Sequence, residues 1–357
     1  MSIEKIAVLG LGKVGSLTAR MLTEAGFQVT GVDTRKLRRT PPFAVVSADL
    51  TDASALPDLL RPYDAVISCL PYALNTAVAT AAHQEGLHYF DLTEDVPTTQ
   101  AIRDLAETSK GVMAPQCGLA PGFVGIVGAH LAGQFESVRT LRMRVGALPQ
   151  HPTGHLGYAF NWSPEGVVNE YLNDCEVIEE GQHKWVSPME WIETLYVGGV
   201  KLEAFTTSGG LGTMCETFEG RIENLDYKSM RYPGHVDMMN FFFHELLMRE
   251  RRDLAGEILT HAKPPVDDDV VYIHVSAEGW SDDRLNRKEY VRAYYPIAVA
   301  GERWTAIAWT TSASACAVIE MVNEGKLPAR GFIKQEEIPF EAFLDTPTGR
   351  LYRDHAA

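Results

Sequence analysis

Three glycines near the N-terminus are spaced so that each can serve a different purpose in a tight turn. An apolar run at 6–9 leads into Gly10, Gly12 and Gly15, and a helical pattern follows at 16–24. In a strand–turn–helix unit, the first glycine allows the turn, the second admits a pyrophosphate close to backbone, and the third lets helix and strand pack. The helix N-terminus supplies free N–H groups for the phosphates. The spacing therefore predicts a dinucleotide site.

An acidic residue stands where such a site needs one. A second predicted strand, 27–32, ends on Asp33, whose carboxylate can accept the ribose hydroxyls of an adenosine and repels a 2′-phosphate. This favours NAD, although the basic stretch 35–39 can receive that phosphate and leaves NADP open. The other residues predicted to contact the cofactor are Lys13, Val14, Thr34, Arg35, Asp49, Cys69, Leu70, Pro71 and Gly118. The alternative is a flavodoxin-like domain whose glycine-rich turn holds no nucleotide.

The elements that would position these residues alternate between strand and helix through the first third of the chain. The predicted strands are 6–9, 27–32, 43–46, 65–70, 88–92 and 111–115. Such alternation predicts a parallel sheet with right-handed crossovers, in which ligands bind beyond the carboxyl ends of the strands. We therefore expect an α/β fold with an N-terminal Rossmann dinucleotide-binding domain at 1–122.

The pattern changes after about residue 135. Strands are predicted at 139–147, 185–205, 270–278, 288–299 and 304–308, and helices at 211–225 and 235–252. We interpret 123–308 as an inserted α+β domain. A helix of small residues at 312–324 would return the segment 309–357 to the first domain.

The composition indicates which kinds of partner and which cellular compartment to expect. A net charge of -15 argues against nucleic acid or an anionic membrane as partner. The five scattered cysteines contain no CxxC pair, which favours a reducing cytoplasm over a disulfide framework or zinc ribbon. No apolar run approaches the ~20 residues of a membrane span, and the chain opens on a strand rather than a signal peptide. We expect a cytoplasmic protein.

Three further segments carry groups that can bind a ligand. The run 117–123 combines Cys117 with glycines that allow close backbone approach, or it is a hinge between domains. The hydroxyls at 206–208 precede a predicted helix and can hold a carboxylate, or they are ordinary N-caps. Arg231 stands beside Pro-Gly and offers a planar fork for a carboxylate, or it forms a structural salt bridge.

Other patterns predict no site. His151 and His155 have metal-like spacing, but Pro152 and Gly154 prevent the helix that would align their rings, so we expect a loop and no metal. The acidic run 267–269 is interpreted as a solvated loop. The run 241–243 of three phenylalanines is interpreted as core or dimer contact. No Gly-x-Ser-x-Gly elbow supports a serine hydrolase.

Taken together, these motifs resemble the saccharopine dehydrogenase family, and within it the lysine 6-dehydrogenase branch. The matching pieces are VLGLGKVG (8–15), DLTE (91–94), CGLAPG (117–122), YAFNWSPEG (158–166), LEAF (202–205) and RYPGH (231–235). The resemblance extends over most of the chain. It implies that the first domain binds NAD or NADP and that the inserted domain supplies substrate contacts and a homodimer surface.

The resemblance also implies a set of roles. A lysine 6-dehydrogenase oxidises the ε-amine of L-lysine to an imine, which is hydrolysed to 2-aminoadipate 6-semialdehyde and ammonia. Arg231 would then bind the α-carboxylate, helped by Thr207 or Ser208, and Glu94 or Glu216 would bind the α-ammonium. Asp91 and Cys117 would lie near the nicotinamide, with Asp91 facing the reacting amine.

Several alternatives stay open from the sequence. The base that accepts a proton from the amine is not identified, and Asp91, Cys117 and His235 are the candidates, in that order, beside a water relay. A glutamate-forming saccharopine dehydrogenase or a carboxynorspermidine synthase-like reductase would share the fold. A non-catalytic nucleotide sensor on the same fold is the alternative from another class.

Overall fold

The structure is a computed structural model that describes residues 2–35 and 40–356. The chain divides into two compact units. Unit 1 comprises Met1–Phe123, Ala298–Arg303 and Ala308–Asp354, and unit 2 comprises Val124–Ile297, Trp304–Ile307 and His355–Ala357. The basic residues Lys36, Arg38 and Arg39, which bear on the choice between NAD and NADP, lie outside the described residues.

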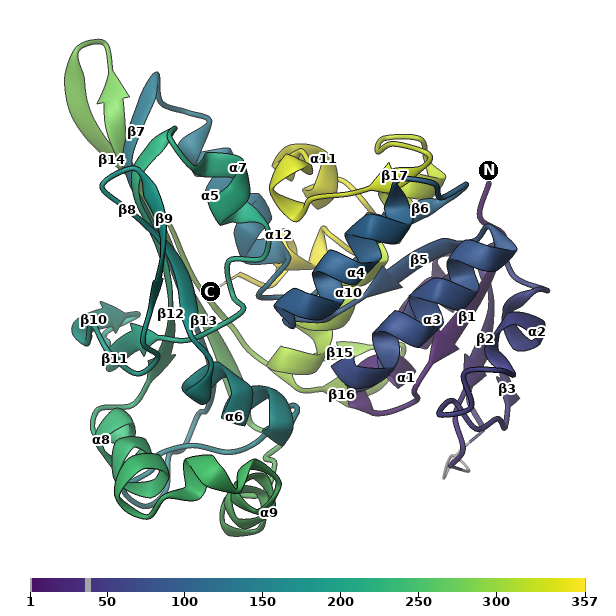
Figure 1. Ribbon diagram of the computed structural model, residues 1–357, viewed down its shortest axis with the longest axis horizontal. Helices are drawn as coiled ribbons and strands as arrows, with labels where there is room; N and C mark the ends of the chain where they lie inside the picture. The colour runs from purple at the N-terminus through teal and green to yellow at the C-terminus, as the bar shows by residue number, and fades with distance from the viewer. Residues whose placement is uncertain (1, 36–39, 357) are drawn as a thin grey trace. The chain divides into compact units, whose positions relative to one another are not determined.

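Unit 1 is built on a parallel sheet in the order β17-β6-β5-β4-β1-β2-β3 (Figure 1). Its strands are β1 (Lys5–Leu9), β2 (Gln28–Val32), β3 (Ala44–Val46), β4 (Ala65–Ser68), β5 (His88–Asp91), β6 (Val112–Ala114) and β17 (Gly331–Phe332). Apart from β17, this is the strand order of a dinucleotide-binding Rossmann sheet. The predicted fold class is confirmed.

Helices cover this sheet because its central strands are apolar on both faces, as the fully buried β4 shows. They are α1 (Lys13–Glu24), α2 (Leu56–Leu60), α3 (Tyr72–Glu85), α4 (Val96–Ala106), α10 (Ala306–Asn323), the 3-10 turn η3 (Gln335–Glu337), α11 (Phe340–Leu344) and α12 (Leu351–Asp354). Side chains of α2, α3 and α4 form one core with the sheet. α10 packs beside α1, where Ser312 Oγ donates to the Val14 carbonyl at 3.1 Å.

Unit 2 is built on a mixed sheet in the order β10-β11-β12-β7-β13-β14, with the β8–β9 hairpin attached to β12. Its strands are β7 (Ser137–Pro149), β8 (Cys175–Glu179), β9 (Gln182–Val186), β10 (Glu193–Val197), β11 (Val200–Thr206), β12 (Ile222–Arg231), β13 (Asp269–Ser281) and β14 (Arg284–Tyr294). The pairing is antiparallel except between β7 and β12. The short strands β15 (Ile297–Val299) and β16 (Glu302–Trp304) pair only with each other in the described part of the chain.

The helical segments of unit 2 are α5 (Phe123–Ala132), α6 (Pro164–Leu172), α7 (Met214–Phe218), α8 (His235–Asn240), the π-helix η1 (Phe241–Glu245), the 3-10 helix η2 (Met248–Glu250) and α9 (Arg252–Ala262). The helix predicted at 211–225 is therefore mostly wrong, since β12 already begins at Ile222. Pairing with β7, and with β8 at Leu225, decides this segment and overrides local helical periodicity.

The strand predicted at 304–308 is also wrong, because α10 begins at Ala306. The carboxylate of Asp269, at the start of β13, accepts the backbone N–H groups of Ala306 and Ile307 at 2.6 and 2.9 Å. These are N–H groups that a helix leaves without an internal partner. The cap comes from a residue distant in the chain, so the local sequence gives no sign of it.

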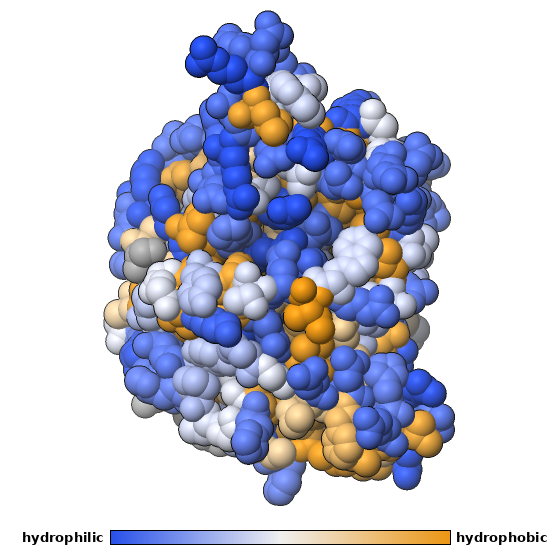
Figure 2. Space-filling model, turned by 90° about the vertical axis from the view of Figure 1, so that its left-hand side faces the viewer, coloured by the Kyte–Doolittle hydropathy of each residue, from blue (hydrophilic) through white to orange (hydrophobic). Residues whose placement is uncertain are grey.

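The phenylalanine run at 241–243 is divided between core and surface. Phe243 is buried in the main core of unit 2, whereas Phe241, Leu246 and Leu247 of the same irregular segment are exposed. Figure 2 shows this side of unit 2 as largely hydrophilic, with hydrophobic surface toward its lower edge, where α8 and α9 lie in Figure 1. None of the helices in the described residues has the length and apolar composition needed to cross a bilayer.

Candidate functional site

The glycine turn of unit 1 lies between the end of β1 and the first turn of α1. Gly10 has a φ of +84°, and a Cβ there would lie 2.9 Å from Leu70 Cδ2. A Cβ at Gly15 would lie 1.8 Å from the Gly10 carbonyl oxygen, so only glycine permits this approach. Gly12 directly precedes α1, and its Cβ position has no heavy atom within 4 Å. The turn therefore leaves open space for a pyrophosphate at the helix N-terminus, and the residues fit a dinucleotide.

The loop after β4 borders this turn. The Cys69 N–H donates to the Leu9 carbonyl at 2.8 Å, Leu70 lies against Gly10, and Pro71 directly precedes α3. β1 and β4 are neighbours, yet the chain continues from them to opposite halves of the sheet. Dinucleotides bind at such a switch point. Burial raises the pKa of the Cys69 thiol to about 12, so the thiol is neutral at physiological pH.

Asp33 stands at the end of β2 and is bound from two directions. Its carboxylate accepts the Leu11 N–H and the Arg35 N–H, each at 2.8 Å, and the Arg35 guanidinium lies 3.2 Å away. Burial alone would raise the pKa of Asp33, but these hydrogen bonds hold it below its ordinary value. Thr34 and Arg35 are exposed. The end of β2 thus presents a carboxylate and a guanidinium together, the groups that select for NAD and for NADP respectively.

The other residues predicted at the cofactor lie around the same turn or in loops of unit 1. Lys13 and Val14 form the first turn of α1. Asp49 is exposed after β3, where it accepts the Thr51 N–H at 2.9 Å in a local turn. Gly118 follows β6, and its carbonyl accepts the Phe123 N–H at 3.0 Å.

Asp91 is fully buried at the carboxyl end of β5, in register with Ser68 at the end of β4. Its carboxylate accepts three hydrogen bonds from neutral groups: the Tyr89 hydroxyl at 2.7 Å and the N–H groups of Thr93 and Gln116 at 2.9 and 3.0 Å. Burial raises the pKa of Asp91 to about 6, although these bonds lower it in part. At neutral pH this site therefore holds a desolvated negative charge.

Two further predicted site residues, Glu94 and Cys117, lie near Asp91. Burial raises the pKa of Glu94 to about 7, and the negative charges of Asp95 and Asp91 add to that shift. The Cys117 thiol is buried, donates to the Ala114 carbonyl at 3.1 Å, and has its pKa raised by burial and by Asp91. A thiol held neutral in this way can donate a hydrogen bond, but it is a poor proton acceptor.

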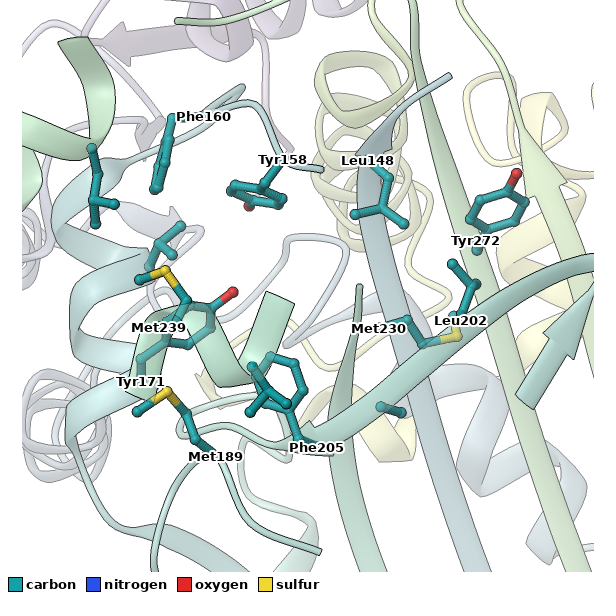
Figure 3. Close-up of a cluster of buried hydrophobic side chains, with 14 of the residues drawn as sticks. Leu148, Tyr158, Phe160, Tyr171, Met189, Leu202, Phe205, Met230, Met239 and Tyr272 are labelled. Carbon is teal, nitrogen blue, oxygen red and sulfur yellow. The ribbon is translucent and has the colours of Figure 1, made fainter. Parts of the chain in front are cut away.

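Arg231 ends β12 in unit 2, where its guanidinium is enclosed by aromatic rings. It lies 4.7 Å from the ring centre of Tyr158 and 5.6 Å from that of Tyr171. Its Nε donates to the Tyr171 hydroxyl at 2.7 Å, and its Nη2 lies 3.8 Å from a carboxylate oxygen of Glu170. That separation is longer than the ~2.7–2.9 Å of a charge-assisted hydrogen bond. Both tyrosines belong to the buried hydrophobic cluster of unit 2 that Figure 3 draws.

His235 completes a directed chain of hydrogen bonds behind Arg231. Its Nδ1 lies 2.9 Å from the Leu156 carbonyl, which can only accept, so Nδ1 carries the proton. Burial and the Arg231 charge lower the pKa of His235 to about 3, which leaves Nε2 as an acceptor for the Tyr171 hydroxyl at 3.0 Å. The Tyr171 oxygen in turn accepts from Arg231. The imidazole is therefore a fixed neutral partner of Tyr171.

The remaining predicted residues of unit 2 lie at different depths. Thr207 is buried and shares a 2.9 Å hydrogen bond with Ser229, two residues before Arg231 on β12. The Ser208 N–H donates to the Glu170 carbonyl at 3.1 Å. Glu216 is exposed on α7.

Sequence reasoning missed the roles of the residues that surround Arg231. Tyr158 opens a motif that was recognised without a role, whereas Tyr171 and Glu170 stand in an ordinary amphipathic helix and give no local signal. Glu203 was also seen only as part of a motif. Its carboxylate accepts the N–H groups of Gly234 and Val236, and so it fixes the start of α8.

Comparison with models of known protein families shows which family the chain belongs to. The model of the saccharopine dehydrogenase NADP binding domain matches residues 6–114, and that of the saccharopine dehydrogenase C-terminal domain matches residues 118–348. The chain belongs to the saccharopine dehydrogenase family. The family predicted from sequence is thereby confirmed, and so is a nicotinamide dinucleotide as the cofactor.

Individual relatives are distant. The chain is 26% identical over 209 residues to a protein of Pyricularia oryzae named saccharopine dehydrogenase [NADP(+), L-glutamate-forming], an alignment that covers 54% of this chain and 46% of the relative. The chain thus matches less than half the length of that curated relative. The apo saccharopine dehydrogenase (L-Glu forming) from Saccharomyces cerevisiae has a TM-score of 0.76 at 15% identity, with 99% of each chain covered.

A second solved structure extends the likeness of fold beyond the saccharopine dehydrogenase family. It is an engineered D-amino acid dehydrogenase bound to NADP+, with a TM-score of 0.51 at 13% identity and 99% of each chain covered. At these identities the two solved structures bear on the fold alone.

Proposed function

We propose that the chain is a nicotinamide-dependent amino-acid dehydrogenase that oxidises the ε-amine of L-lysine with NAD, yielding 2-aminoadipate 6-semialdehyde and ammonia. The observation that supports it most directly is Asp91. A buried carboxylate with only neutral hydrogen-bond donors lies at the carboxyl edge of the sheet that forms the nucleotide turn. Such a group stabilises a cation beside it, and a cation develops at carbon and nitrogen when an amine loses hydride.

The proton chemistry favours carboxylates over the other candidate bases. Bound NAD(P) supplies the hydride acceptor, and the amine must be neutral to release hydride. Efficient general bases have a pKa near the working pH. The pKa values of about 6 for Asp91 and about 7 for Glu94 meet that condition. His235 does not, because its pKa is lowered to about 3 and its free nitrogen accepts from Tyr171.

In this proposal Arg231 binds the α-carboxylate of the substrate. Both tyrosine rings lie close to the guanidinium carbon, and a carboxylate would use donors in the guanidinium plane. Tyr171 fixes the orientation of that plane through Nε. The competing interpretation is a structural pair between Arg231 and Glu170 at 3.8 Å.

The second candidate is a glutamate-forming saccharopine dehydrogenase that uses NADP. The name of the Pyricularia oryzae relative favours it, as does the exposed Arg35 beside Asp33, which could receive a 2′-phosphate. Saccharopine carries more carboxylates than lysine and would need cationic partners beyond Arg231.

The decisive experiment follows the absorbance of reduced nicotinamide with lysine or saccharopine as substrate and NAD or NADP as acceptor. We expect reduction with lysine and NAD, and none with Nε-acetyl-lysine, which lacks a free ε-amine. Turnover of saccharopine alone would replace the proposal by the second candidate. No reduction with any amino acid tested would contradict an enzymatic role and favour a nucleotide sensor.

A further inference from the structure

The segment that joins α8 to α9 in unit 2 has unusual backbone geometry. It runs through the π-helix Phe241–Glu245, then Leu247 with a φ of +58°, then the 3-10 helix Met248–Glu250. π-helices and non-glycine residues with positive φ are costly, and they concentrate at functional sites. The activity proposed above uses no residue of this segment.

A hollow of about 520 Å³ opens beside this segment. Its walls include Tyr171 from α6, Glu190 from the loop after β9, Asn240 from the end of α8, His244 and Arg249 from the irregular segment, and Arg252 from the start of α9. The volume is within the ~300–1,000 Å³ of small-molecule sites. All of these residues belong to unit 2, so the hollow is formed by one compact body.

The cations of this hollow lack carboxylate partners among the described residues. Arg252 Nη1 donates to the side-chain oxygens of Asn169 and Asn173 at 2.9 and 2.8 Å, and Arg249 Nη1 lies 3.0 Å from His244 Nδ1. This is notable in a chain with 47 acidic residues and only 32 lysines and arginines, where carboxylate partners are abundant. Two guanidinium groups therefore retain N–H donors for an anion from outside the chain.

Two neighbouring features reinforce the positive potential. Arginine can only donate, so His244 Nδ1 accepts and the second ring nitrogen carries a proton that it can offer to a ligand. Arg252 is the first residue of α9, an 11-residue helix, whose N-terminal dipole favours negative charge. Glu190 is the acidic member of the wall, and it would require a hydrogen-bond donor on the ligand.

We propose that this hollow binds a small dianion, a dicarboxylate or a phosphate, held by Arg249 and Arg252 with a hydroxyl of the ligand toward Glu190. The occupied site would lie beside Tyr171, whose hydroxyl accepts from Arg231. The proposal concerns binding alone and does not rest on the proposed function.

The test is isothermal titration of the full chain, without nucleotide, with inorganic phosphate and separately with L-malate at low ionic strength. We expect saturable binding of at least one probe, and at least a roughly tenfold weaker Kd in the double variant Arg249→Gln/Arg252→Gln. Arg251→Gln is the control, since it removes one positive charge from an arginine that lies between them in the chain and does not line the hollow. Its Kd should stay within about twofold.

The possible outcomes either identify the class of ligand or contradict the site. Phosphate binding alone assigns a phosphate ligand, and malate binding alone assigns a dicarboxylate. Absence of saturable binding of both probes overturns the site, as does an equal loss of affinity in Arg251→Gln, which would indicate diffuse electrostatic attraction. Should the double variant melt early, Arg249→Gln alone, whose side chain is exposed, repeats the comparison with a folded protein.

Discussion

Asp91 in unit 1 and Arg231 in unit 2 are both buried charged groups, yet their surroundings differ. Asp91 accepts three hydrogen bonds from neutral donors, and burial raises its pKa to about 6. Arg231 is enclosed by two tyrosine rings, bonded to one of their hydroxyls, and placed 3.8 Å from the carboxylate of Glu170.

The difference follows from what each group can do when water is removed. A carboxyl group can take up a proton and become neutral, so it tolerates burial at the expense of a shifted pKa. A guanidinium stays charged at any physiological pH, so the fold must supply partners for it. Unit 1 therefore contains a charge that can be switched by pH, and unit 2 contains a permanent one. The following predictions test that contrast.

The largest expected effect is the pH dependence of stability in Asp91→Asn. The pKa of Asp91 is raised from 3.8 to about 6 on folding, so the folded state holds the proton more tightly. Its contribution to stability is complete below the unfolded pKa and is lost as pH rises through the folded pKa. Relative to Asp91→Asn, the wild type should lose about 3 kcal/mol between pH 3 and pH 7. Urea unfolding across that range measures it, and a constant difference would contradict the shift.

Turnover by Asp91→Asn should fall almost as far in free energy. Asparagine keeps the shape and accepts the same N–H groups, but it removes the charge that would stabilise the developing cation. We expect kcat/KM to fall by at least roughly 10², about 2.7 kcal/mol, with NAD affinity little changed. Near-normal turnover would make Asp91 structural and leave the amine to Glu94 or Glu216.

The permanent charge is tested by Arg231→Lys. Lysine keeps the charge but loses the planar fork and the guanidinium contacts with the Tyr158 and Tyr171 rings. The expected rise in KM corresponds to a loss on the order of 1.5–3 kcal/mol. The melting temperature is the control: an unchanged KM with unchanged melting would remove Arg231 from the substrate site. A lower melting temperature alone would support the structural pair with Glu170.

The smallest expected effect is a change of cofactor preference in Asp33→Ser. Asp33 is a third kind of buried charge, because it pairs with the exposed cation Arg35 and its pKa is lowered. Asp33→Ser removes the carboxylate that repels a 2′-phosphate. We expect the ratio of kcat/KM for NAD to that for NADP to fall by roughly tenfold, about 1.4 kcal/mol. A wild type that already prefers NADP would refute the assignment of NAD.

Local patterns predicted most of unit 1. The glycine spacing, the fully apolar β4 and the regular alternation of helix and strand each depend on neighbours close in the chain, and they predicted six of the seven strands in the sheet. They missed the edge strand β17, which comes from the distant C-terminal segment. In unit 2 the same reasoning placed β7 but mistook the start of β12 for helix, because the start of that strand is decided by its pairing with β7 and β8.

The sequence by itself therefore determined the dinucleotide fold, the family and the residue types available for chemistry. Only the tertiary structure decided which of them carry an altered charge or a fixed orientation. Burial sets the pKa of Asp91, and the aromatic enclosure with Tyr171 fixes Arg231, although Tyr171 and Arg231 lie 60 residues apart in the chain. Desolvation and long-range hydrogen bonds depend on atoms brought together by folding, and no local pattern records them.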